Sequence, residues 1–138
     1  MLFASVARRV GRELHNRLAP SDWLKKKRAV DRAFDAANGV DTGGYTYLSS
    51  LKINSPNWRD GNSHIAADPD EFVAAMNALN IDPSHFTFID LGSGKGRALM
   101  LARSYGFKEL IGVEFSAELV ELARRNGIET ICADATEY

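Results

Sequence analysis

The chain of 138 residues has very little cysteine, since Cys132 is its single one. A lone cysteine excludes a disulfide framework and a metal site built from several thiolates. Its apolar neighbours predict a small buried residue on a strand. Histidine is scarce as well: His15, His64 and His85 lie far apart in the sequence. Each is predicted to be a surface or packing histidine, so no side chain stands out as a general base.

Long hydrophobic runs are also missing. No stretch approaches the ~20 consecutive apolar residues of a membrane-spanning helix. The chain starts with a short apolar stretch, but Arg8 and Arg9 follow it, whereas a secretory signal carries its charge in front. Hydrophobic residues make up 45% of the chain and charged residues 25%, as in ordinary globular domains. We therefore expect about one domain in the cytoplasm.

A net charge of −1 conceals an uneven distribution. Residues 1–32 hold nine Lys and Arg against three acidic residues, and the rest holds eight against fifteen. A basic arm on an acidic body is typical of proteins that meet nucleic acid, an anionic membrane or an acidic partner. A solvated face of a helix gives the same pattern, and both interpretations stay open.

Three regions follow from the pattern of the chain. Residues 1–39 are predicted to form a basic helical arm, because apolar residues recur at helical spacing over 3–18 and again after the possible caps Ser21 and Asp22. Residues 40–67 are predicted to be an irregular segment that contains glycines and the aromatic residues Tyr45, Tyr47 and Trp58. The third region covers residues 68–138.

The third region has the pattern of an α/β fold. Asp68 and Pro69 are typical of a helix start, and the helix is predicted to end at Leu79. After it, short apolar runs alternate with helical segments that are bounded by capping residues. The predicted order is strand Phe86–Leu91, helix Arg97–Tyr105, strand Leu110–Glu114, helix Ala117–Asn126 and strand Ile128–Cys132. This β-α-β-α-β series is half of a doubly wound parallel sheet.

A glycine loop joins the first strand to its helix, with the spacing Gly92-x-Gly94-x-Gly96. Loops of this kind bind nucleotide-like ligands at the carboxyl end of a strand. A Walker A loop would need glycine at the position of Ile89 and Ser or Thr in place of Gly96, so that class is excluded. A dinucleotide fingerprint would need a small residue at Arg97, and that class is the weaker fit.

Acidic residues at three successive strand ends favour a ligand without phosphate. Asp90 would repel a pyrophosphate but suits the cationic end of S-adenosyl-L-methionine. Glu114 is placed to accept hydrogen bonds from both ribose hydroxyls. Asp134 is placed to accept from the adenine amino group, with the Ala135 amide facing a ring nitrogen. For each acid alone, a helix cap or a solvated strand end is the alternative.

These residues resemble known motifs in order and spacing. The segment 88–97, Phe-Ile-Asp-Leu-Gly-Ser-Gly-Lys-Gly-Arg, resembles motif I of the class I S-adenosylmethionine-dependent methyltransferases. Segment 111–116 resembles their acidic-loop motif and segment 132–137 their adenine motif. The resemblance implies a Rossmann-like fold and S-adenosyl-L-methionine as cofactor. It implies the cofactor-binding residues Asp90, Gly92, Ser93, Gly94, Gly96, Glu114, Phe115, Asp134 and Ala135, with Phe115 packed on adenine.

The same resemblance implies a seven-stranded sheet, of which this sequence would hold three strands. We therefore expect a partial domain whose first strand has an apolar, unpaired edge, to be completed by a C-terminal half or by a second chain. The predicted function is methyl transfer to an unidentified acceptor, with weak or no turnover by this chain alone. The aromatic residues of 40–67 would cover the core, cap the cofactor or touch the acceptor. The alternatives are a non-catalytic remnant or interaction module and, less well supported, an oxidoreductase fragment.

Overall fold

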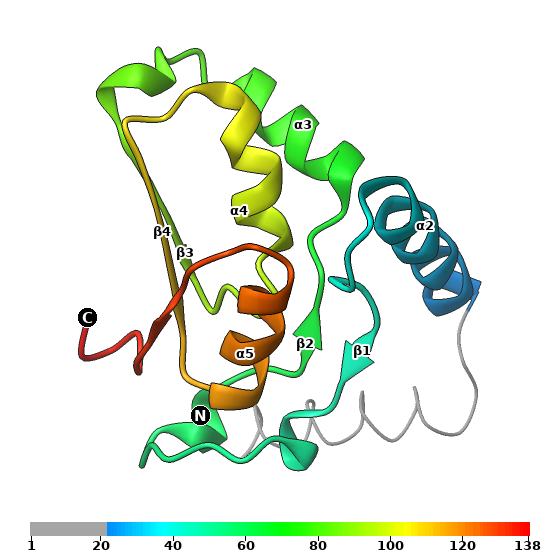
Figure 1. The fold of residues 1–138 in the computed structure, drawn as a ribbon, viewed down its shortest axis with the longest axis vertical. Helices are drawn as coiled ribbons and strands as arrows, with labels where there is room; N and C mark the ends of the chain where they lie inside the picture. The colour runs from blue at the N-terminus through cyan, green and yellow to red at the C-terminus, as the bar shows by residue number, and fades with distance from the viewer. Residues whose placement is uncertain (1–21) are drawn as a thin grey trace, which may run out of the picture.

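The computed structural model describes residues 22–138, arranged as a small parallel sheet with helices against it (Figure 1). The helix expected over 3–18 and most of the basic arm lie outside these residues. The helices are α2 (Asp22–Asn38), α3 (Pro69–Ala78), α4 (Arg97–Ala102) and α5 (Ala117–Arg125). The strands are β1 (Tyr45–Thr46), β2 (His64–Ile65), β3 (Thr87–Leu91), β4 (Glu109–Glu114) and β5 (Ile131–Cys132).

The parallel sheet has the order β3-β4-β5. Its register pairs Leu91 with Val113 and Glu114 with Cys132, so all three strands end at one edge. The predicted α/β fold class and the alternation of strands and helices are confirmed. As expected, β3 pairs only with β4 within the described residues and leaves its other edge open.

Helices α4 and α5 lie against one side of this sheet (Figure 1). The buried core between them is formed by Leu99, Ala123 and Ile128. Aromatic contacts extend the core to α3, where Phe72 packs edge-on against Phe88 with 5.9 Å between ring centroids. Apolar burial of this kind is the main term that holds the layers together.

Local signals set the ends of these helices. Asp68 caps α3 by accepting hydrogen bonds from the amides of Asp70 and Glu71. The Ser116 hydroxyl caps α5 by accepting from the Leu119 amide. The predicted helix up to Tyr105 changes to a 3-10 turn after Ala102 and stops at Gly106, whose φ of 75° suits glycine.

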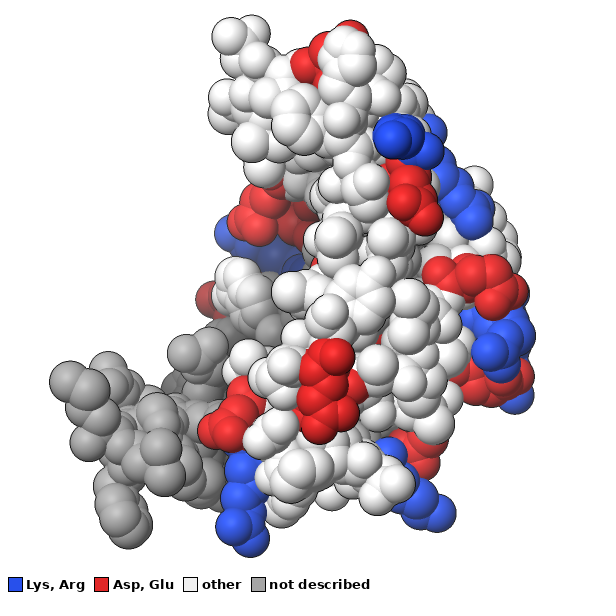
Figure 2. Space-filling model, turned by 90° about the vertical axis from the view of Figure 1, so that its left-hand side faces the viewer, with Lys and Arg blue, Asp and Glu red and all other residues white. Residues whose placement is uncertain are grey.

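The opposite side of the sheet is poorly covered, which corrects two expectations. The apolar run that forms β3 is typical of a buried parallel strand, but Ile89 and Leu91 are 47% and 58% exposed. Cys132 was predicted to be buried and is exposed, because β5 has only two residues at the outer edge of the sheet. Uncharged surface predominates on the face in Figure 2, and the charged groups lie down its right-hand edge, on its left side and in an acidic group near the lower centre.

The irregular segment 40–67 has more structure than the sequence predicted. Strands β1 and β2 form a short antiparallel pair, with Tyr45 opposite Ile65 and Thr46 opposite His64. Two 3-10 turns lie between them, over Leu48–Ser50 and Trp58–Asp60. This pair runs beside the glycine loop and carries the chain from α2 to α3 (Figure 1).

Helix α2 is more than a solvated face. Leu24, Lys27 and Asp31 are buried on the side that faces the rest of the molecule. The other basic residues of α2, including Arg28 and Arg32, are exposed. Within residues 22–138, none of the helices has the length and apolar character needed to cross a bilayer.

Candidate functional site

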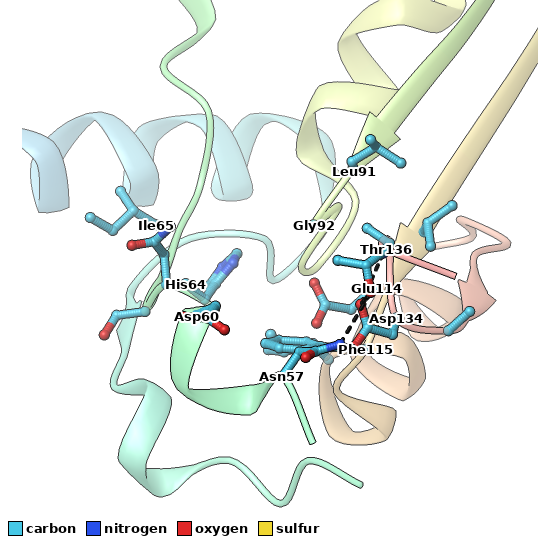
Figure 3. Close-up of a pocket in the computed structure, with 17 residues that line it drawn as sticks. Asn57, Asp60, His64, Ile65, Leu91, Gly92, Glu114, Phe115, Asp134 and Thr136 are labelled. Carbon is cyan, nitrogen blue, oxygen red and sulfur yellow. Dashed lines mark hydrogen bonds between the residues drawn. The ribbon is translucent and has the colours of Figure 1, made fainter. Parts of the chain in front are cut away.

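A cavity of about 380 Å³ lies at the carboxyl ends of β3, β4 and β5. Five of the nine predicted cofactor-binding residues line it: Gly92, Glu114, Phe115, Asp134 and Ala135. They come from all three strand ends, as the motif spacing predicted. The opposite wall comes from the segment 57–65, which faces them across the cavity (Figure 3). Tyr45, Tyr47 and Trp58 are not among the lining residues, so this wall is built mainly from their polar neighbours.

Glu114 is the central acid of the cavity and is 3% exposed. Its Oε2 accepts a hydrogen bond from the Gly94 amide at 2.8 Å, and Oε1 accepts from the Ser116 amide at 2.8 Å. Burial raises the pKa of Glu114, and the two amides oppose that shift. A carboxylate has about four lone-pair sites, so Glu114 keeps acceptor capacity for two ligand hydroxyls.

The amides of the glycine loop are largely used inside the protein. Those of Gly92 and Ser93 donate to the Val113 carbonyl at 2.8 and 3.0 Å. The Gly94 amide donates to Glu114, and the Gly96 amide donates to the Ser93 carbonyl. These four amides are therefore already paired in the structure, and the glycines of the loop allow close packing around the cavity.

Four predicted site residues do not line the cavity: Asp90, Ser93, Gly94 and Gly96. The Ser93 hydroxyl is buried beneath the loop and would be 3.0 Å from a Cβ on Gly112. A Cβ on Gly96 would be 2.8 Å from Ile128, so glycine lets helix α4 pack closely there. Asp90 is half-buried near Glu114, and burial raises its pKa. Their direct contact with a ligand stays a prediction.

Asp134 is tied to the opposite wall by contacts that the sequence did not reveal. Its Oδ2 accepts from the Ser55 hydroxyl. It also accepts from the Asn57 side-chain amide at 3.1 Å (Figure 3). Its Oδ1 accepts from the amide and hydroxyl of Thr136. The Ser55 hydroxyl and these other donors hold the pKa of Asp134 well below its usual range. Asp134 is therefore an ionised carboxylate that links the two walls through hydrogen bonds. A hydrogen bond from the adenine amino group would add to those from Ser55, Asn57 and Thr136.

Phe115 closes the bottom of the cavity together with a glycine of the opposite wall. A Cβ on Gly61 would be only 2.3 Å from Cζ of Phe115, so a larger residue does not fit between them. The ring lines the cavity next to Glu114 (Figure 3). A flat apolar ring in this position is suited to stacking against a purine base.

His64 is a cavity residue that the sequence did not single out. It was predicted to be a surface or packing histidine, but its side chain lines the cavity from β2 (Figure 3). Burial lowers the pKa of His64 to about 4, with Lys95 and Arg97 adding to the shift and Asp31 opposing it. The ring is therefore neutral at physiological pH.

On its far side, the glycine loop is held to α2 by buried charges. The Arg97 guanidinium contacts Asp31 at 2.5 Å and Asp35 at 3.2 Å, and its side chain is 1% exposed. Its Nε donates to the Thr42 hydroxyl at 2.7 Å. Burial alone would raise the pKa of Asp31, but hydrogen bonds from Lys27 and Arg97 outweigh it and lower that pKa. We call Arg97, Asp31, Asp35 and Thr42 the Arg97 cluster.

Lys95 also points away from the cavity. Its ammonium group contacts Asp41 at 3.0 Å and donates to the Gly43 carbonyl at 2.8 Å. A lysine that cradles phosphate would turn toward the loop amides. Together with the occupied amides, this geometry agrees with the sequence in excluding a Walker A site. The cavity at the three strand ends is instead lined by carboxylates, a neutral imidazole and an aromatic ring, a set that suits an uncharged or cationic nucleoside.

Sequence comparison found a family match for the part of the chain that supplies one of the two walls of the cavity. The family described as "Methyltransferase domain" matches residues 89–138, which include the glycine loop, Glu114 and Asp134. Over this segment the match agrees with the resemblance to methyltransferases that the motifs indicate. A comparison with curated proteins gave no match.

A comparison with solved structures found several methyltransferases that are similar to parts of this chain. A SAM-dependent methyltransferase from Geobacter sulfurreducens, in complex with S-adenosyl-L-homocysteine, is 26% identical over 51% of this chain and 31% of its own, with a TM-score of 0.43. A protein-L-isoaspartate O-methyltransferase is 20% identical over 81% of this chain and 40% of its own, with a TM-score of 0.45. Coclaurine N-methyltransferase bound to N-methylheliamine and SAH is 19% identical, with coverages of 99% and 44% and a TM-score of 0.41. The chain spans less than half the length of each.

Proposed function

We propose that this chain binds S-adenosyl-L-methionine at the ends of β3, β4 and β5 and supplies the cofactor-binding portion of a methyltransferase. The observation that carries the proposal is the cavity itself. The segment that matches the methyltransferase-domain family contributes Gly92, Glu114 and Asp134 to one cavity, each from a different strand end.

The order of the strands supports a particular layout of the ligand. Because β4 lies between β3 and β5, Glu114 lies between the glycine loop and Asp134. A ribose beside Glu114 would place adenine toward Asp134 and Ala135, next to the Phe115 ring. The methionine part would then lie toward Gly92. This layout is the one that the sequence motifs predict.

The geometry speaks against a dinucleotide at the same place. Pyrophosphate needs free amides at the glycine loop, and the amides of Gly92, Ser93 and Gly94 already donate inside the protein. Asp90 and Glu114 add negative charge beside that position. Arg97 stands where the fingerprint requires a small residue, and its guanidinium is turned to α2 rather than to the cavity.

Isothermal titration calorimetry with S-adenosyl-L-homocysteine and with NAD tests this proposal. We expect the chain to bind S-adenosyl-L-homocysteine and to show much weaker or no heat with NAD. The variant Glu114→Gln should weaken binding on the order of ten-fold, because one acceptor oxygen becomes a donor. Glu118→Gln is the matched control, since Glu118 is exposed on the first turn of α5.

Two outcomes would contradict the proposal. Tighter binding of NAD would favour the oxidoreductase alternative. If Glu114→Gln and Glu118→Gln changed the affinity for S-adenosyl-L-homocysteine equally, the cavity would not be the binding site, even if the nucleoside binds.

A further inference from the structure

His64 is the cavity residue that the methyltransferase motifs do not account for. It belongs to β2, outside the segment 89–138 that matches the family. Its ring lies directly over Gly94, since a Cβ on Gly94 would be 2.3 Å from Nδ1 and 2.7 Å from Cε1. The His64 ring thus reaches from the opposite wall to the glycine loop, and it fits there because Gly94 has no side chain (Figure 3).

The contacts of His64 fix which nitrogen carries its proton. Nε2 lies 3.3 Å from the Thr42 carbonyl oxygen. A carbonyl can only accept, so Nε2 carries the hydrogen of the neutral ring and Nδ1 is left as an acceptor. Thr42 is itself held by the Arg97 cluster, because its hydroxyl donates to Asp35 at 2.6 Å and accepts from Arg97.

The place of His64 along the cavity indicates which part of a nucleoside it would meet. Strand order puts the glycine loop at the end of the cavity away from Asp134. His64 lies over that loop, so it is separated from the predicted adenine position by Glu114. An acceptor nitrogen in this position matches a donor group on the ligand, and the ammonium group of the amino-acid part is such a donor.

We propose that His64 contacts the amino-acid end of S-adenosyl-L-methionine beside Gly94, with Nδ1 accepting a hydrogen bond from the ligand's ammonium group. The inference rests on the proposed function and extends it to a residue outside the matched segment. It also gives the Arg97 cluster a positioning role, because Thr42 links that cluster to the histidine ring.

Comparing the binding of two nucleosides distinguishes a direct contact between His64 and the ligand from a purely structural role of His64. 5′-Methylthioadenosine keeps the adenine, ribose and sulfur of S-adenosyl-L-homocysteine but lacks the amino-acid part. In calorimetry with the full chain, His64→Ala should lower the affinity for S-adenosyl-L-homocysteine on the order of ten-fold. The affinity for 5′-methylthioadenosine should change by less than about two-fold, because its contacts lie at the other end of the cavity.

Two further variants complete the test. His64→Gln keeps a donor for the Thr42 carbonyl and has an amide oxygen that can accept from the ligand. It should therefore bind 5′-methylthioadenosine normally and keep more of the affinity for S-adenosyl-L-homocysteine than His64→Ala does. His85→Ala is the matched control, because His85 lies on the surface beside Asp82 with its side chain 76% exposed. It should leave both affinities unchanged.

The outcomes are distinct. If His64→Ala weakens both nucleosides equally, or neither, the proposed contact is wrong. If the unaltered chain binds neither nucleoside, the proposed function fails rather than the assignment of His64 alone.

Discussion

The two sides of the glycine loop hold charge in opposite ways. On the side of α2, Arg97 is paired with Asp31 and Asp35, and the pKa of both carboxyls is lowered. On the side of the cavity, burial raises the pKa of Asp90 and Glu114, and backbone amides rather than cations hold Glu114. The first arrangement fixes the loop to the rest of the protein. The second keeps the Glu114 carboxyl as an acceptor at the edge of the cavity, where a ligand can reach it.

The largest expected effect comes from breaking the side of α2. Arg97→Ala removes the cation and leaves Asp31 and Asp35 without their shared partner in a buried position. We expect a loss of about 3–5 kcal/mol in the free energy of unfolding, measured by urea denaturation. Arg97→Lys should restore only part of it, because one ammonium cannot reproduce the guanidinium's contacts with Asp31, Asp35 and Thr42.

Arg124→Ala is the control for that measurement. Arg124 pairs with Glu121 on the surface of α5, and its side chain is 54% exposed. A change within about 0.5 kcal/mol is expected there. A loss below about 1 kcal/mol for Arg97→Ala would show that the Arg97 cluster does not hold the loop.

The next largest effect is on the pH dependence of the free energy of unfolding, and it comes from His64 on the side of the cavity. The pKa of His64 is about 4 in the folded protein and about 6.5 when unfolded, so between these values the unfolded chain binds the extra proton. The stability that His64 contributes is complete above pH 6.5 and is lost as the pH falls toward 4. Relative to His64→Gln, the unaltered protein should lose up to about 3 kcal/mol over this range.

The comparison with His64→Gln is needed because other groups titrate nearby. Lys95, Arg97 and Asp31 act on His64, and Asp90 and Glu114 titrate with raised pKa values. These groups are present in both proteins, so they largely cancel in the difference. Parallel stability curves for the two proteins from pH 7 to pH 4 would contradict a neutral, half-buried His64.

The smallest effect concerns the contact between Gly94 and His64. Gly94→Ala meets a backbone φ of 53° and the imidazole ring, whereas Gly106→Ala meets a φ of 75° and no atom within 4 Å. We expect Gly94→Ala to cost about 1 kcal/mol more than Gly106→Ala in thermal or urea unfolding. Combining it with His64→Ala should remove that excess in a double-mutant cycle. If the extra loss of stability from Gly94→Ala remained in the absence of the His64 ring, it would come from the backbone conformation and not from the contact with His64.

Much of the fold could be predicted because its signals are local. Asp68, Ser116 and Gly106 end or start helices through contacts with residues only a few positions away. The spacing of Gly92, Glu114 and Asp134 predicted one edge of a parallel sheet, and the structure brings these residues to one cavity. Motif order carries such information because parallel strands end at the same side.

The rest depends on contacts between distant residues. Arg97 lies 66 positions from Asp31, and Ser55 lies 79 positions from Asp134. No periodicity marks such pairs, so the buried charges of α2 and the tether on Asp134 were missed. The prediction for Cys132 was wrong for a related reason, because the burial of a strand residue depends on what covers it rather than on its neighbours in sequence.

The burial of Arg97 also sets a rule for dividing this chain into pieces. A fragment that began at residue 68 would keep the glycine loop and all three strands of the parallel sheet. It would also carry a guanidinium that has lost both carboxylates and the Thr42 hydroxyl, in a place made to exclude water. The smallest piece expected to fold therefore reaches back through Asp31, more than fifty residues ahead of the segment that sequence comparison detects.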